Sequence, residues 1–101
     1  MKGLIVNADD FGWDVDTVAS TINLFEARAI SSATIMVGRL ATESAIEYAV
    51  RSQNRFSIGL HFNIVDGLIP ATGNARNSLT GEDGTFRVSN SQRIRAIMGM
   101  L

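Results

Sequence analysis

The sequence predicts an α/β fold in which parallel strands alternate with helices. Three segments of strand length occur at 4–6, 32–37 and 56–62, and two segments with helical spacing of apolar residues separate them. A long segment rich in turn residues and a last helical segment follow. Because strands that alternate with helices pair in parallel through right-handed crossovers, we expect the order strand, helix, strand, helix, strand, loop, helix.

The first strand is predicted from Leu4-Ile5-Val6, a continuous apolar run that is typical of a strand buried on both faces. The motif Asn-Ala-Asp-Asp-Phe-Gly follows it at 7–12. Asp14 is expected to cap the first helix, because its carboxylate can accept hydrogen bonds from the amides of the first turn. The apolar face of this helix is formed by Val15, Val18, Ile22, Phe25 and Ala29.

The remaining elements are predicted in the same way. Residues 32–37 predict the second strand, 42–51 an amphipathic helix capped by Thr42, and 56–62 the third strand. Residues 64–87 contain Pro70 and several Gly and Asp-Gly signals, which indicate a long loop. Residues 89–101 predict a last helix with a Ser89 cap and no stop signal beyond Leu101. Three strands are few for a parallel sheet, so either the protein is longer or another chain completes the sheet, and we expect residues 1–101 to be a single partial domain.

Composition excludes several classes of protein. The chain is 46% hydrophobic and 19% charged with a net charge of −1, and its basic residues are scattered rather than clustered, which argues against nucleic-acid binding. The absence of cysteine excludes a disulfide framework, a zinc-thiolate site and a thiol nucleophile. The first apolar run is too short for a signal peptide or a membrane span. We therefore expect a soluble, cytoplasmic protein.

Three side chains that can carry chemistry follow predicted strands. Asp9 and Asp10 come after the first strand, and His61, the one histidine, lies at the end of the third. The carboxyl ends of parallel strands meet at one edge of the sheet, where sites are built. Carboxylate oxygen and imidazole nitrogen together suit a divalent cation. Neighbouring strand residues point to opposite sides, so one aspartate could bind a metal while the other takes a proton from water.

Simpler interpretations stay open. The Asp-Asp pair could be a turn and helix-start signal, and His61 could be a packed core residue. Trp13 could cover the first loop or form a wall on which a sugar stacks. A phosphate-accepting receiver domain is excluded, because it needs an aspartate after the third strand and a later lysine, and Lys2 is the one lysine in the chain.

The motifs together resemble a known family. Asn-Ala-Asp-Asp-Phe-Gly at 7–12, followed by Ser-Ser-Ala-Thr-Ile-Met-Val at 31–37 and Ile-Gly-Leu-His-Phe at 58–62, is similar to the opening of the YdjC/ChbG-like carbohydrate deacetylases. Gly67, Pro70 and the segment 79–86 extend the resemblance. It implies a partial (β/α) barrel of the polysaccharide-deacetylase-like type. It also implies metal-dependent removal of an acetyl group from an N-acetylated amino sugar, either chitooligosaccharide-like or hopanoid-linked.

The resemblance also implies roles for individual residues. Asp9 would be the general base, Asp10 and His61 would bind a divalent metal ion (Mg or Zn), and a third ligand, a further histidine, would lie beyond Leu101. The chain departs from the family pattern at Val18, where asparagine is frequent, and at Arg28, where glycine is frequent.

Two other functions compete with the enzyme. The chain could be a truncated, non-catalytic protein that self-associates, or a sugar-binding module that uses the same edge of the sheet. The expected partners are an acetylated amino sugar and, because strand edges would be exposed, further copies of the chain in a homo-oligomer. Nucleic acid and a membrane span are not expected.

Overall fold

The computed structural model describes residues 2–52, 55–69 and 78–100. It divides into two compact units, Met1–Phe62 and Asn63–Leu101. The α/β class and the order of the elements are confirmed. The elements are β1 (Asn7–Phe11), α1 (Val15–Glu26), β2 (Ser32–Met36), α2 (Thr42–Arg51), β3 (Ser57–His61) and α3 (Ser89–Ile97). The single domain, the long loop at 64–87 and the barrel type stay predictions, and Pro70 lies outside the described residues.

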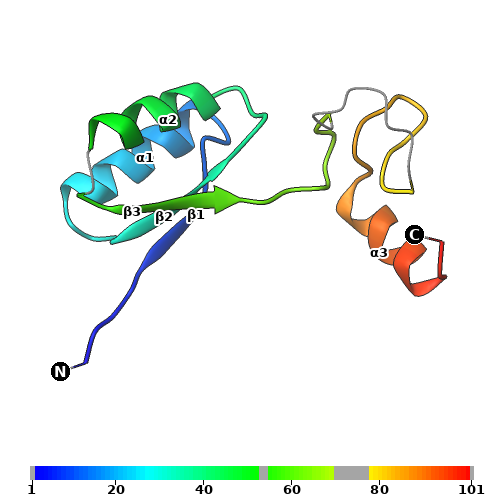
Figure 1. Ribbon diagram of the computed structural model, residues 1–101, viewed down its shortest axis with the longest axis horizontal. Helices are drawn as coiled ribbons and strands as arrows, with labels where there is room; N and C mark the ends of the chain where they lie inside the picture. Colours follow the sequence, from blue (N-terminus) through cyan, green and yellow to red (C-terminus); the bar gives the residue numbers. More distant parts are fainter. Residues whose placement is uncertain (1, 53–54, 70–77, 101) are drawn as a thin grey trace. The chain divides into compact units, whose positions relative to one another are not determined.

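The first unit is a parallel sheet in the order β1-β2-β3, with α1 and α2 on one of its faces (Figure 1). Ala33 and Ile35 of β2 point into the core under the helices. Phe11 and Phe25 are fully buried there, and Phe25 stacks on Phe56 with ring centroids 4.2 Å apart. Because strand side chains alternate, the residues between these core positions lie on the face that carries no helix in the described unit.

The first strand lies further along the chain than predicted. It begins at Asn7, and Leu4 and Ile5 are 86% and 80% exposed. The reason is the residue at which its neighbour begins. Pairing of β1 with β2 starts at Asn7 opposite Ser32, which is the first residue of β2. The apolar run at 4–6 therefore precedes the sheet, and the motif at 7–12 supplies the strand.

Helix caps confirm one prediction and contradict two. Asp14 accepts a hydrogen bond from the Thr17 amide at 2.7 Å, and this bond lowers the pKa of Asp14. Thr42 does not cap α2, because its hydroxyl donates instead to the Met36 carbonyl at 2.8 Å, at the end of β2. Ser89 is also not a cap, since it is the first residue of α3 and its amide donates to Asp66 Oδ1 at 3.1 Å.

The last helix ends earlier than predicted. It stops at Ile97, and Gly99 follows with φ of 67°. The amide of Met100 then bonds to the Arg95 carbonyl at 2.8 Å, which is the closure typical of a helix that ends on a left-handed glycine. Gly99 is thus the stop signal that the sequence analysis overlooked. Among the helices the structure describes, none is long and apolar enough to cross a bilayer.

Candidate functional site

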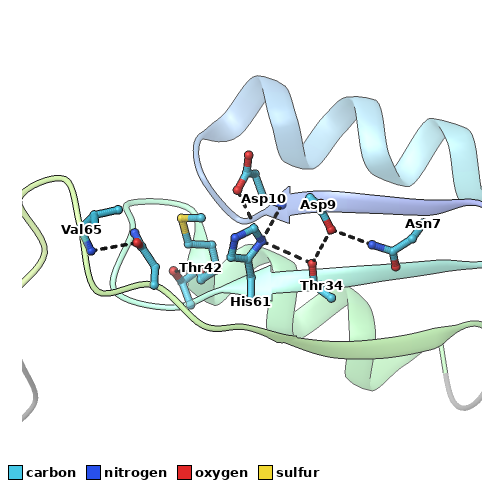
Figure 2. Close-up of polar contacts among 9 residues, drawn as sticks. Asn7, Asp9, Asp10, Thr34, Thr42, His61 and Val65 are labelled. Carbon is cyan, nitrogen blue, oxygen red and sulfur yellow. Dashed lines mark hydrogen bonds and ion pairs between the residues drawn. The ribbon is translucent and has the colours of Figure 1, made fainter. Parts of the chain in front are cut away.

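The structure brings the three predicted site residues together at the carboxyl ends of the strands (Figure 2). His61 ends β3 and lies in register with Met36, the last residue of β2. Its Nδ1 is 3.4 Å from Asp10 Oδ1 and accepts a hydrogen bond from the Asp10 amide at 3.3 Å. Thr34 Oγ1 lies between the imidazole and Asp9, 3.4 Å from His61 Nδ1 and 3.1 Å from Asp9 Oδ1. His61 is therefore neither a core residue nor turned away from the acids.

An irregularity in β1 explains how two neighbouring aspartates reach one cluster. Ala8 pairs with Ala33 and Phe11 pairs with Ile35, so two residues of β1 lie opposite one residue of β2. Such a bulge redirects side chains and breaks the alternation of a regular strand. Asp10 has a left-handed backbone with φ of 59°, which aspartate tolerates better than most residues. The prediction that both aspartates follow simple strand alternation is therefore wrong at this point.

Gly12 holds the turn that follows the bulge. Its φ is +100°, and a Cβ there would lie 3.2 Å from Thr42 Cα and 3.3 Å from Ala45 Cβ. The amide of Trp13 bonds to the Asp10 carbonyl at 2.9 Å and closes the turn. A glycine is thus required where the end of β1 packs against the start of α2, and this packing fixes the backbone that carries Asp10.

Sequence analysis missed three polar residues of the site. Asn7 Nδ2 donates to Asp9 Oδ1 at 2.7 Å, and Thr34 Oγ1 donates to the same oxygen at 3.1 Å. Ser32 Oγ in turn donates to Asn7 Oδ1 at 2.7 Å. The signal that could have found Ser32 and Thr34 is their alternation with Ala33 in β2, which predicts one polar face on an otherwise apolar strand.

Asp10 and His61 fit a divalent cation as neighbouring ligands. Two atoms that each lie about 2.1 Å from one cation, at right-angled or tetrahedral positions, are about 3.0–3.4 Å apart, and the observed separation is 3.4 Å. In the structure Nδ1 accepts from the Asp10 amide at 3.3 Å, and a cation bound by Nδ1 would take the place of this contact. The side chains of His61 and Asp10 are 27% and 51% exposed, so a cation can enter from solvent.

This fit to a divalent cation concerns two ligands, Asp10 and His61. Within the described part of the chain, no group of three or more carboxylates, imidazoles and thiols is arranged to hold a metal ion. Asp9 is separated from the pair by its own hydrogen bonds to Asn7 and Thr34. The geometry thus distinguishes the two aspartates, one directed at the imidazole and one fixed by neutral donors.

Trp13 lies just beyond the bulge, at the same edge of the sheet. The guanidinium of Arg39, which follows β2, lies 3.7 Å from the centroid of the indole ring. Trp13 as a whole is 38% exposed. One face of the indole is thus occupied by a cation, and stacking of a sugar on Trp13 stays a prediction.

A cavity of about 430 Å³ lies at the other ends of the strands. It is lined by Arg28, Ile30, Ser31, Arg55 and Phe56, the residues that precede β2 and β3 or end α1. Because none of the predicted site residues lines it, we do not assign the chemistry of Asp9, Asp10 and His61 to this cavity.

Comparison with known proteins finds three relatives with the same description, carbohydrate deacetylase. The chain is 39% identical over 85 residues to a human carbohydrate deacetylase and 36% identical over 85 residues to the mouse one, in each case over 82% of this chain. It spans about a quarter of the length of these curated relatives (25% and 26%). A zebrafish carbohydrate deacetylase is 30% identical over 83 residues, 26% of its length.

A solved structure from Enterococcus faecalis, described as a candidate cellobiose-phosphate cleavage protein, superposes with a TM-score of 0.62 at 27% identity. The match covers 85% of this chain and 34% of that one. Residues 3–98 match the sequence profile of the family described as YdjC-like protein. The matched region contains all three predicted site residues and nearly the whole chain, and the chain therefore belongs to the YdjC-like protein family.

Proposed function

We propose that the protein of which these residues form part removes an acetyl group from an N-acetylated amino sugar by metal-dependent hydrolysis. The observation that carries the proposal is the 3.4 Å pair of Asp10 Oδ1 and His61 Nδ1 beside a separately held Asp9. The names of the relatives support deacetylation of a carbohydrate. We further propose a chitooligosaccharide-like or hopanoid-linked substrate and a cytoplasmic location.

In this proposal Asp10 and His61 would hold Mg²⁺ or Zn²⁺. A bound cation would polarise the amide carbonyl and make water a stronger nucleophile at neutral pH. Hydrolytic sites usually keep three protein ligands, so a further ligand would come from outside the described residues. Asp9 would take the proton of the attacking water, because its carboxylate lies in the same cluster but is not directed at His61.

A second candidate is a non-catalytic, self-associating protein. It is favoured by the finding that the described residues offer two ligands rather than three. Such a protein would bind a cation weakly and release no product. A sugar-binding module at the same edge of the sheet would instead bind saccharide whether or not a cation is present.

Acetate release separates these functions. The complete product of the gene that encodes this chain is incubated with a short acetylated amino-sugar oligomer, with added Mg²⁺ or Zn²⁺ and with a chelator. We expect acetate to be released with metal and not with chelator. If saccharide binds equally well with and without the chelator and no acetate is released, the protein is a sugar-binding module. Neither acetate nor binding would indicate the non-catalytic protein.

Substitutions assign the roles of the three residues. Asp10→Asn and His61→Ala should lose metal retention by elemental analysis, because each removes one ligand, and asparagine still tolerates the left-handed backbone at this position. Asp9→Asn should keep the metal and lose hydrolysis. Asp16→Asn, the same change in the first turn of α1, is the control and should keep both. Normal metal content in Asp10→Asn or His61→Ala would refute its assignment as a ligand.

A further inference from the structure

We propose that Asn7 and Thr34 are positioning residues that hold Asp9 by one carboxylate oxygen, so that its other oxygen is the one that accepts a proton. The inference rests on the proposed function, because it concerns the residue assigned there as the base. Both donors bind the same oxygen, Oδ1, at 2.7 Å from Asn7 Nδ2 and 3.1 Å from Thr34 Oγ1. Hydrogen bonds to a carboxylate are stronger than neutral ones, so two of them on one oxygen restrict rotation of the group.

Asn7 is itself held in the orientation that this role needs. An amide side chain can present either its oxygen or its nitrogen to a neighbour. Ser32 Oγ donates to Asn7 Oδ1 at 2.7 Å, from the residue directly opposite Asn7 in the sheet. Because an ionised carboxylate can only accept, the amide nitrogen must face Asp9, and the amide oxygen is left to accept from Ser32.

Thr34 has one proton and two candidate acceptors. Its Oγ1 is 3.1 Å from Asp9 Oδ1 and 3.4 Å from His61 Nδ1. The shorter contact is to a charged oxygen, and Nδ1 already accepts from the Asp10 amide. The Thr34 hydroxyl therefore donates its proton to the hydrogen bond with Asp9 Oδ1. The hydroxyl oxygen then faces the imidazole. One side chain in the middle strand thus sets the spacing between the proposed base and a proposed ligand (Figure 2).

These contacts are not explained by stability. The core cluster lies under the helices and contains none of Asn7, Asp9 and Thr34. Asn7 and Asp9 are exposed, and hydrogen bonds among exposed groups contribute little to the free energy of folding because water replaces them. An ordered set of polar contacts on an exposed face, next to a bulge, is better explained by a requirement for geometry at Asp9.

The first test is kinetic and uses the complete gene product with added Zn²⁺. Thr34→Val keeps the shape of the side chain and removes the hydroxyl, and we expect kcat for acetate release to fall about tenfold, as is typical when a supporting hydrogen bond is lost, with KM unchanged. Thr34→Ser restores the hydroxyl and should restore kcat. Asn7→Ala should behave like Thr34→Val, and Asn23→Ala, on an exposed position of α1, should behave like the wild type.

The second test needs no activity. In the complete gene product, the ¹³C signal of the Asp9 carboxyl carbon is assigned from its loss in Asp9→Asn and is compared at one pH. We expect it to shift in Thr34→Val and Asn7→Ala and to stay in place in Thr34→Ser and Asn23→Ala. An unshifted signal in both Thr34→Val and Asn7→Ala overturns the inference, as does wild-type kcat in both.

The two tests also separate this inference from the proposed function. If the wild-type gene product releases no acetate under any condition, the proposed function fails and the carboxyl signal alone decides where Asp9 is held. If the wild type is active and Thr34→Ser is as slow as Thr34→Val, the hydroxyl has no positioning role and the inference fails while the function stands.

Discussion

Asp10 combines a ligand's chemistry with an unusual backbone. A left-handed conformation costs a residue other than glycine about 1–2 kcal/mol, and less for aspartate, whose side chain can bond locally. In this chain the conformation accompanies the bulge that directs the carboxylate to within 3.4 Å of the imidazole. Such conformations persist where the surroundings enforce them and are concentrated at functional sites. Here the enforcing contact is the close packing around Gly12.

Arg28 also has a left-handed backbone conformation, but it is not one of the site residues. It follows α1 with φ of 54°, and the amide of Ala29 bonds to the Leu24 carbonyl at 2.9 Å, which is a helix ending that usually has glycine at this position. Arg28→Gly should therefore raise the free energy of unfolding by about 0.5–1 kcal/mol, after allowance for the greater freedom of glycine in the unfolded chain. Urea denaturation measures the change.

Arg28→Ala is the matched control, because it removes the side chain and leaves the left-handed backbone strained. It should give no gain in stability. An equal gain from alanine and glycine would show that the arginine side chain, rather than its backbone, limits stability at the end of α1.

At the scale of elements, α1 and α2 are joined by one polar cluster beside the core. The Tyr48 hydroxyl of α2 donates to Glu26 Oε1 of α1 at 2.8 Å, and Arg55 Nη2 lies 3.1 Å from Glu26 Oε2. The hydrogen bond from Tyr48, followed by that from Arg55, lowers the pKa of Glu26. Burial, followed by the bond to Glu26, raises the pKa of Tyr48.

These shifts predict how stability depends on pH. A carboxyl group whose pKa is lowered by folding stabilises the protein at pH values above its ordinary pKa, which is 4.5 for Glu26. This contribution is lost as the pH falls through the pKa that the group has in the folded protein. Tyr48→Phe removes the largest cause of the shift. Its melting temperature should therefore lie below that of the wild type at about pH 7, and the difference should narrow toward about pH 3. A difference that is constant over this range would contradict the role of Glu26.

The elements that could be predicted from sequence are those governed by local pattern. The apolar spacing of α2 gave its bounds correctly, 42–51. The start of β1 depended on where β2 begins, which no local pattern contains. The same difference applies to the site. Asp9, Asp10 and His61 were predicted because parallel strands share one edge, whereas Asn7 and Thr34 require the register of β1 against β2 and the bulge within it.

At the scale of the molecule, the described helices of the first unit, α1 and α2, lie on the same face of its sheet (Figure 1). The helices cover one face of the sheet, and within the described residues β1 and β3 each pair on one side only. Leu60 in β3 and Phe62 just after it are 63% and 76% exposed. Strand edges with exposed apolar side chains favour pairing with other chains. This supports the proposal of a homo-oligomer.

Self-association can be tested on the edge strand directly. We expect light scattering of the 101-residue chain to give a mass above that of the monomer, and the mass to rise with concentration. Leu60→Lys should reduce it, because a lysine on an edge strand opposes pairing with a second chain. Leu40→Lys is the matched control, since Leu40 is 99% exposed outside any strand and should leave the mass unchanged. A monodisperse monomer of the wild-type chain at all concentrations would contradict the proposal, and an equal effect of both lysines would show that net charge, rather than the β3 edge, controls association.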